Sequence, residues 1–268
     1  MLCIAKKGSG AYFTRLLIEQ CQIKGVPVIR WSKPAEWVTC ETRIEEAKQW
    51  IKDVLQPVLD NMTDDSTAYG QDFGRDGDLS NIWLMQKRDP TRWRMAVMID
   101  LRCIPFDVQA LIRDHILQHV PKLHHASFDA RGNGQSHAEG ALQQLGAKRV
   151  SCIKATVQFY DEWFPKYKQT YEDRSFLVAD CEDIITDHRR VVLVRGRPTM
   201  DEGRDKGEDG LPRHGDSAIG GLMAYHATCQ PVAEIEFEST GIRRVLAEVV
   251  IDEDDDRITG LNDFSGYV

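Results

Sequence analysis

Residues Gly70–Ser80 read Gly-Gln-Asp-Phe-Gly-Arg-Asp-Gly-Asp-Leu-Ser, and we expect the fold to be organised around this stretch. It places one carboxylate, Asp72, at the end of a short apolar run, and Ser80 opens the next run at residues 81–86. A strand that delivers a carboxylate into a Gly-rich turn is a common way to present a metal ligand on a rigid scaffold. The stretch therefore predicts a turn between two strands and one side of a candidate site.

Two later stretches carry similar carboxylates. Residues Ser127–Gly134 (Ser-Phe-Asp-Ala-Arg-Gly-Asn-Gly) contain Asp129, and residues Arg213–Ala218 (Arg-His-Gly-Asp-Ser-Ala) contain Asp216. Carboxylates crowded together repel one another and raise one another's pKa, so such a cluster is unfavourable unless it binds cations. Two hard cations held by Asp oxygens about 3.5–4 Å apart supply what phosphodiester hydrolysis needs. We expect the three aspartates to converge on divalent metal, although each alone also fits an ordinary turn or helix cap.

The pattern around these carboxylates predicts a mixed sheet. Three β-rich runs joined by short turns, at residues 67–73, 81–87 and 94–103, indicate an antiparallel meander. Helical and extended segments then alternate, with a fourth strand at residues 123–129 and a last helix at 216–229 that is rich in small residues. This order is typical of an α/β fold with helices on the faces of its sheet.

We expect three regions along the chain. Residues 1–65 are predicted to form a helical lead-in, residues 66–231 the domain that carries the site, and residues 232–268 an acidic and disordered tail. The tail holds ten acidic and three basic side chains, so it accounts for −7 of the formal charge of −8. The rest of the chain is close to neutral and can still present a basic face to nucleic acid.

Composition excludes several other classes of protein. The seven cysteines are scattered and never form Cys-x-x-Cys, which argues against a disulfide framework and against a zinc knuckle. No apolar run approaches the roughly 20 residues of a membrane span, and the N-terminus lacks the order of a signal peptide. We therefore expect a cytoplasmic protein without a membrane partner. Gly8-Ser9-Gly10 is not followed by Lys-Ser/Thr, so the chain has no ATP-binding signature.

Polar and basic residues near the three carboxylates are candidates for phosphate contacts. Such side chains on polar loops clamp phosphates and make binding dependent on salt. The turn Gly132-Asn133-Gly134 at a helix start also offers backbone N–H groups to an anion. The candidate DNA contacts are Arg75, Arg131, Asn133, Arg213 and His214.

The three carboxylate segments together resemble the nuclease half of the large terminase subunit of Mu-like phages and prophages. They occur in that family's order, and the resemblance extends over about residues 1–230. It implies an RNase H-like fold and a two-metal nuclease with Asp72, Asp129 and Asp216 as catalytic, metal-binding residues. It also implies Asp78 as an accessory metal ligand and Mg²⁺ or Mn²⁺ as the cofactor.

Membership would make the protein an endonuclease that cuts double-stranded DNA during genome packaging in the bacterial host. Its partners would be the terminase ATPase domain, the small terminase subunit and the portal. Because this chain has no ATPase motif, no packaging ATPase activity is expected of it. Two other functions remain open from the sequence: a catalytically silent module that docks on DNA or the portal, and a junction resolvase or transposase-like nuclease.

Overall fold

An eight-stranded mixed sheet forms the centre of the fold in the computed structural model, which describes residues 10–74, 79–201 and 203–232. The strands follow the order β1-β8-β5-β4-β3-β6-β7, and β2 pairs with β5 beside this path. Their bounds are β1 (Gln22–Ile23), β2 (Val28–Ser32), β3 (Thr67–Asp72), β4 (Leu79–Asp89), β5 (Arg92–Arg102), β6 (Leu123–Asp129), β7 (Val150–Ile153) and β8 (Phe176–Ala179).

The topology confirms the predicted RNase H-like mixed sheet. Strands β3, β4 and β5 form the antiparallel meander, while β6 and β7 are added parallel to β3 and to each other. The resulting order β5-β4-β3-β6-β7 is that of the RNase H-like fold. Within the predicted lead-in, β2 pairs with β5 and β1 pairs with β8, both in parallel, so this segment adds strands as well as helices. The proposed domain boundaries remain predictions.

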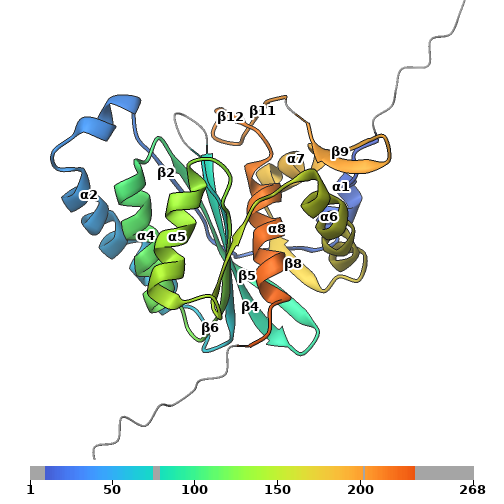
Figure 1. The fold of residues 1–268 in the computed structure, drawn as a ribbon, viewed down its shortest axis with the longest axis horizontal. Coiled ribbons are helices and arrows are strands. Elements are labelled where there is room, and N and C mark those ends of the chain that lie inside the picture. Colours follow the sequence, from blue (N-terminus) through green and yellow to red (C-terminus); the bar gives the residue numbers. More distant parts are fainter. Residues whose placement is uncertain (1–9, 75–78, 202, 233–268) are drawn as a thin grey trace, which may run out of the picture. The chain divides into compact units, whose positions relative to one another are not determined.

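Helices cover both faces of the sheet (Figure 1). One buried cluster joins the sheet to α1, α6, α7 and α8, and a second joins its other face to the helical segment 43–60, α4 and α5. This packing makes three layers, helix–sheet–helix. The helices are α1 (Arg15–Glu19), α2 (Arg43–Trp50), α3 (Gln56–Asp60), α4 (Phe106–His119), α5 (Gly134–Leu145), α6 (Val157–Glu172), α7 (Glu182–Arg189) and α8 (Asp216–Thr228), with a 3₁₀ turn at Ala35–Thr39 and a π turn at Ile51–Leu55 joining α2 to α3.

Helix α8 lies very close to the sheet because small residues face it. A Cβ atom added to Gly70 of β3 would overlap the backbone of Ala224, and one added to Gly220 would overlap the side chain of Asn81. Asn81 pairs with Asp72 across β3 and β4, so the first turns of α8 lie at the end of β3 that carries Asp72. Gly70, the first residue of the stretch Gly70–Ser80, therefore allows the close approach of α8 to the sheet.

The polar, Gly-rich segment 195–212 contributes to two short hairpins. Strand β9 (Val191–Val194) pairs with β10 (Arg197–Met200), and β11 (Asp205–Lys206) pairs with β12 (Pro212–Arg213), both antiparallel. Within the described part of the chain, no helix has both the length and the apolar character needed to span a bilayer.

Candidate metal centre

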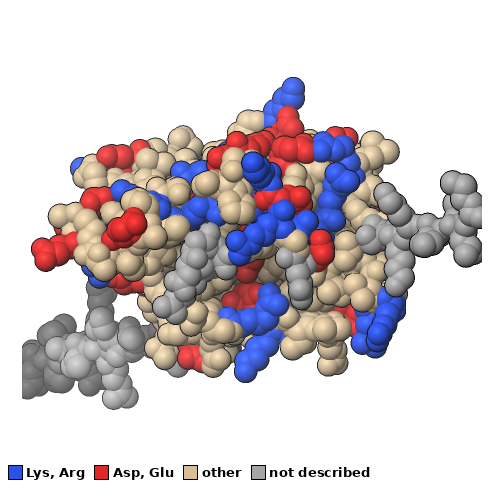
Figure 2. Space-filling model, turned by 90° about the horizontal axis from the view of Figure 1, so that it is seen from above, with Lys and Arg blue, Asp and Glu red and all other residues tan. Residues whose placement is uncertain are grey.

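The carboxyl ends of two neighbouring parallel strands bring Asp72 and Asp129 to the same edge of the sheet. Asp72 ends β3 and Asp129 ends β6, and the preceding residues, Gln71 and Phe128, lie opposite each other in the pairing. Asp216 is the first residue of α8. Figure 2 shows this edge from above, with acidic side chains in the hollow centre of the face and Lys and Arg side chains around them. Sites at the carboxyl ends of strands are common in such sheets.

A pocket of about 300 Å³ lies between the strand end, α6, β10 and the start of α8. Asp72 and Asp216 both line it, together with Arg131 and His214. The remaining lining residues are Tyr160, Thr199, Met200, Gly215 and Ile219.

The electrostatics show that the three carboxylates interact. Burial raises the pKa of Asp72 well above its usual range, and the charges of Asp129 and Asp216 raise it further. For Asp216, burial and then the charge of Asp187 raise the pKa to about 7, against a backbone hydrogen bond from the His214 amide at 3.0 Å. A bound cation would stabilise the ionised form of Asp72 against the charges of Asp129 and Asp216. The donor set, all carboxylate oxygens, suits hard divalent metals.

Arg131 is the counter-ion of Asp129. Its Nε donates to both carboxylate oxygens of Asp129 at 3.1 and 2.9 Å, and its Nη2 donates at 2.6 Å. The Arg131 backbone amide donates to the same carboxylate at 3.1 Å. The Asp129 side chain is 5% exposed while that of Arg131 is 48% exposed, so the guanidinium closes the solvent side of the carboxylate. With Asp129 held in this way, the oxygens of Asp72, Asp129 and Asp216 do not all lie within 4.8 Å of one another.

Arg213 lies in the core, which corrects its prediction as a DNA contact. Its guanidinium donates to Asp187 and Asp100 at 2.8 Å each, and lies 3.5 Å from Asp183. The side chain is 0% exposed. A fully buried guanidinium cannot reach a phosphate at the surface, and all three of its nitrogens already donate to carboxylates.

The other predicted contacts fall in different places. The His214 residue lines the aspartate pocket. Asn133 instead precedes α5 and lines a separate pocket of about 580 Å³ next to the start of α4. Arg75 and Asp78 lie outside the described residues.

Two neighbours of the site were not predicted. Tyr160 of α6 lies under Arg131, with the guanidinium 5.7 Å from the ring centre. Asp187 of α7 accepts a hydrogen bond from the Ser217 amide at 2.9 Å and so fixes the first turn of α8 behind Asp216. Neither position carries a local sequence signal, because each meets the site only through the packing of its helix.

A second group of potential ligands lies at the end of α7. Among described residues, Cys181, Asp183 and Glu208 are the three His, Cys or acidic side chains whose ligand atoms all lie within 4.8 Å of one another. Arg30 already occupies this group, with Nη2 2.8 Å from Asp183 and 2.7 Å from Glu208. The group is therefore neutralised by a cation of the chain itself.

Fold and site together define an RNase H-like α/β protein with a carboxylate-lined pocket at the carboxyl ends of its central parallel strands. Comparison with known proteins identifies relatives of this chain. The chain is 32% identical over 238 residues to the Mu-like prophage FluMu protein gp28 of Haemophilus influenzae, covering 88% of this chain and 47% of that protein. It is 34% identical over 232 residues to the probable terminase large subunit gp28 of Escherichia phage Mu, covering 84% and 42%.

These matches confirm the resemblance to the large terminase subunit of Mu-like phages and prophages, and the chain spans about half the length of these relatives. Among solved structures, the large terminase nuclease from the thermophilic phage G20c superposes with a TM-score of 0.48 at 15% identity, over 61% of this chain and 82% of that one. No protein-family model matches the chain.

Proposed function

We propose that this protein is a metal-dependent DNA endonuclease that hydrolyses phosphodiester bonds by a two-metal mechanism. The observation that carries the proposal is the placement of Asp72 and Asp129 at the ends of two adjacent parallel strands and of Asp216 at the start of α8, where the charges of Asp129 and Asp216 both raise the pKa of Asp72. Asp72 and Asp216 line the pocket and Asp129 ends the adjacent strand, and negative charges gathered in this way are unfavourable unless cations neutralise them. Bound Mg²⁺ or Mn²⁺ would activate a water and neutralise charge on the scissile phosphate.

The chain's own residues have distinct roles in this proposal. Asp72, Asp129 and Asp216 hold the cations, and Asp78, which lies outside the described residues, is a further ligand. Arg131 balances the charge of Asp129 and lines the pocket, where its side chain, 48% exposed, can also meet a DNA phosphate. His214 lines the same pocket and is placed to contact the phosphate or orient a water. Asp187, through Ser217, keeps Asp216 at the pocket.

We further propose that the protein acts on double-stranded DNA in phage genome packaging. The support is its relationship to the probable large terminase subunit of phage Mu. In this role its partners are a terminase ATPase domain, the small subunit and the portal, in the cytoplasm of the bacterial host.

Plasmid cleavage in the presence of Mn²⁺ tests the proposal. Wild-type protein should nick and linearise plasmid. Asp129→Asn should reduce the cleavage rate by at least about 100-fold, the scale seen when one electrostatic element of an active site is removed. Asp180 is an exposed aspartate after β8, and the control variant Asp180→Asn should cut like wild type. Intact plasmid with wild type, or equal cutting by Asp129→Asn, would contradict an endonuclease and favour a docking module. Preference for branched over linear DNA would indicate a resolvase-like enzyme instead.

A further inference from the structure

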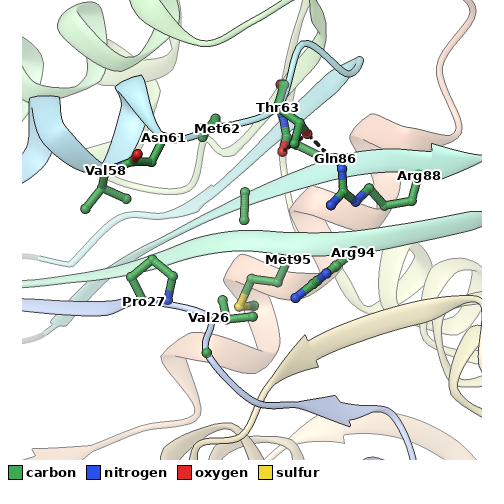
Figure 3. A pocket seen from close by; sticks show the side chains of 12 residues that line it. Val26, Pro27, Val58, Asn61, Met62, Thr63, Gln86, Arg88, Arg94 and Met95 are labelled. Atoms are coloured by element: carbon green, nitrogen blue, oxygen red, sulfur yellow. Dashed lines mark hydrogen bonds between the residues drawn. The ribbon is translucent and has the colours of Figure 1, made fainter.

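A second pocket lies at the other end of the meander from the three aspartates. It has a volume of about 300 Å³, the lower end of the roughly 300–1,000 Å³ typical of ligand pockets. Figure 3 shows it between the segment after α3, the loop before β2 and the far ends of β4 and β5. Its lining residues are Gly25, Val26, Pro27, Val58, Asn61, Met62, Thr63, Gln86, Arg88, Arg94, Met95 and Ala96.

The pocket is separate from the candidate metal centre. Along β3 and β4, Asp72 pairs with Asn81, whereas Gln86 of the pocket pairs with Thr67 at the start of β3. Five residues of strand separate Asn81 from Gln86, which is about 17 Å at the rise of a β-strand. A ligand of this pocket is therefore distinct from any substrate held by the aspartates.

Arg94 gives the pocket an uncompensated positive charge. It lies on β5, is only partly exposed, and its side chain makes no hydrogen bond or ion pair with any other residue that the structure describes. Arg88 of β4 stands beside it but is already committed, with Nη1 2.8 Å from Asp65 and 3.0 Å from the Thr63 hydroxyl. A partly buried guanidinium without a partner is a ready site for a carboxylate.

The remaining walls are mostly apolar. Val26, Pro27, Val58, Met62 and Met95 present aliphatic or thioether surface to the same space that Arg94 enters (Figure 3). A nucleic-acid phosphate would leave this surface in contact with water, whereas a branched aliphatic group would cover it. Flexible Met side chains are also suited to apolar groups of varied shape.

We propose that this pocket binds a peptide segment of a partner protein, one that carries a carboxylate next to a branched apolar side chain. The carboxylate pairs with Arg94, and the apolar side chain packs on Met62 and Val58, next to the buried Met95. Gln86 and Thr63, which are hydrogen-bonded to each other, line the polar side of the pocket.

The experiment uses protein labelled with ¹³C in the methionine methyl groups. The half-buried Met62 and the buried Met95 line the pocket and report on it, and Met85, Met98 and Met223, which are buried and do not line it, report on the fold. The probe is the blocked dipeptide acetyl-Leu-Asp-amide, and its control is acetyl-Leu-Asn-amide, which has the same shape without the charge. We expect the Asp peptide to shift the Met62 and Met95 signals saturably at millimolar concentration, and the Asn peptide to bind at least about tenfold more weakly.

Two variants and one anion complete the test. Arg94→Gln should weaken the Asp peptide at least about tenfold while the signals of the three buried methionines stay in place, and Arg92→Gln, an exposed arginine two residues away, should leave binding unchanged. The proposal is overturned if the two peptides bind equally, if Arg94→Gln binds like wild type, or if neither pocket methionine responds. It is also overturned if inorganic phosphate competes for the site at lower concentration than the Asp peptide, since that would indicate a phosphate site.

Discussion

Replacing Arg213 by methionine tests whether this arginine stabilises the core or contacts DNA. Arg213→Met keeps an apolar stem of similar length and removes the guanidinium that pairs with Asp100 and Asp187 at 2.8 Å each. Removing one partner of a buried ion pair costs roughly 3–5 kcal/mol, because the remaining charge is left without a partner. Arg30 still lies 3.8 Å from Asp100, so we expect a loss in the lower half of that range.

The assay is thermal unfolding without divalent cations or DNA. For a domain of this size each kcal/mol shifts the Tm by about 2–4 °C, so Arg213→Met should unfold about 6–16 °C below wild type. The control is Arg197→Gln, whose guanidinium is 65% exposed and pairs with Asp161 at 3.4 Å. An exposed pair of this kind contributes at most about 1 kcal/mol, so the control should shift the Tm by a few degrees or less. An Arg213→Met protein with unchanged Tm and weakened DNA binding would contradict the buried, stabilising role of Arg213 and would support its contact with a DNA phosphate.

Three further perturbations follow from the contacts. Arg131→Gln removes the counter-ion of Asp129 and should therefore tighten Mn²⁺ binding, measured by calorimetry without DNA. We expect a change of about fivefold after allowing for the 48% exposure of the Arg131 side chain. Weaker or equal Mn²⁺ binding would contradict the role of this ion pair. Gly70→Ala should lower the free energy of unfolding in urea by about 1–3 kcal/mol, because its methyl group overlaps the Ala224 backbone, whereas Gly10→Ala, with open space around it, should have little effect. Burial lowers the pKa of His188 to about 4, so the folded state favours the neutral ring. The contribution of this histidine to the free energy of unfolding is full above about pH 6.5 and should be lost as the pH falls toward 4, because the unfolded chain takes up the proton first. A His188→Gln protein with the same acid sensitivity in urea titrations would show that this histidine is not responsible.

Local sequence patterns were sufficient for the sheet and for the positions of the three aspartates. The predicted strand at residues 123–129 is β6 as observed, because an apolar run there is bounded by Pro121 and by the Gly-rich turn after Asp129. The sequence showed a last helix rich in small residues, and the close approaches of Gly220 in α8 to Asn81 and of Gly70 in β3 to Ala224 show why they are small. Both features depend only on residue size, polarity and spacing within one segment.

The surroundings of the candidate site could not be predicted from the sequence, because they depend on contacts between segments that are far apart along the chain. Arg213 stands next to a polar, Gly-rich stretch and so suggests a surface position, but its partners Asp187 and Asp100 are 26 and 113 residues away. Tyr160 and Asp187 contribute to the site through the packing of α6 and α7, which no local pattern encodes. Arg131 stands two residues after Asp129, yet its role as counter-ion follows from the side-chain geometry.

The central claim is that Asp72, Asp129 and Asp216 together hold divalent cations, and anomalous diffraction from a crystal soaked in Mn²⁺ tests it most directly. We predict two anomalous peaks about 3.5–4 Å apart, each within about 2.0–2.4 Å of carboxylate oxygens of these aspartates. Manganese bound only beside Cys181, Asp183 and Glu208, or no ordered manganese at the ends of β3 and β6, would contradict the claim.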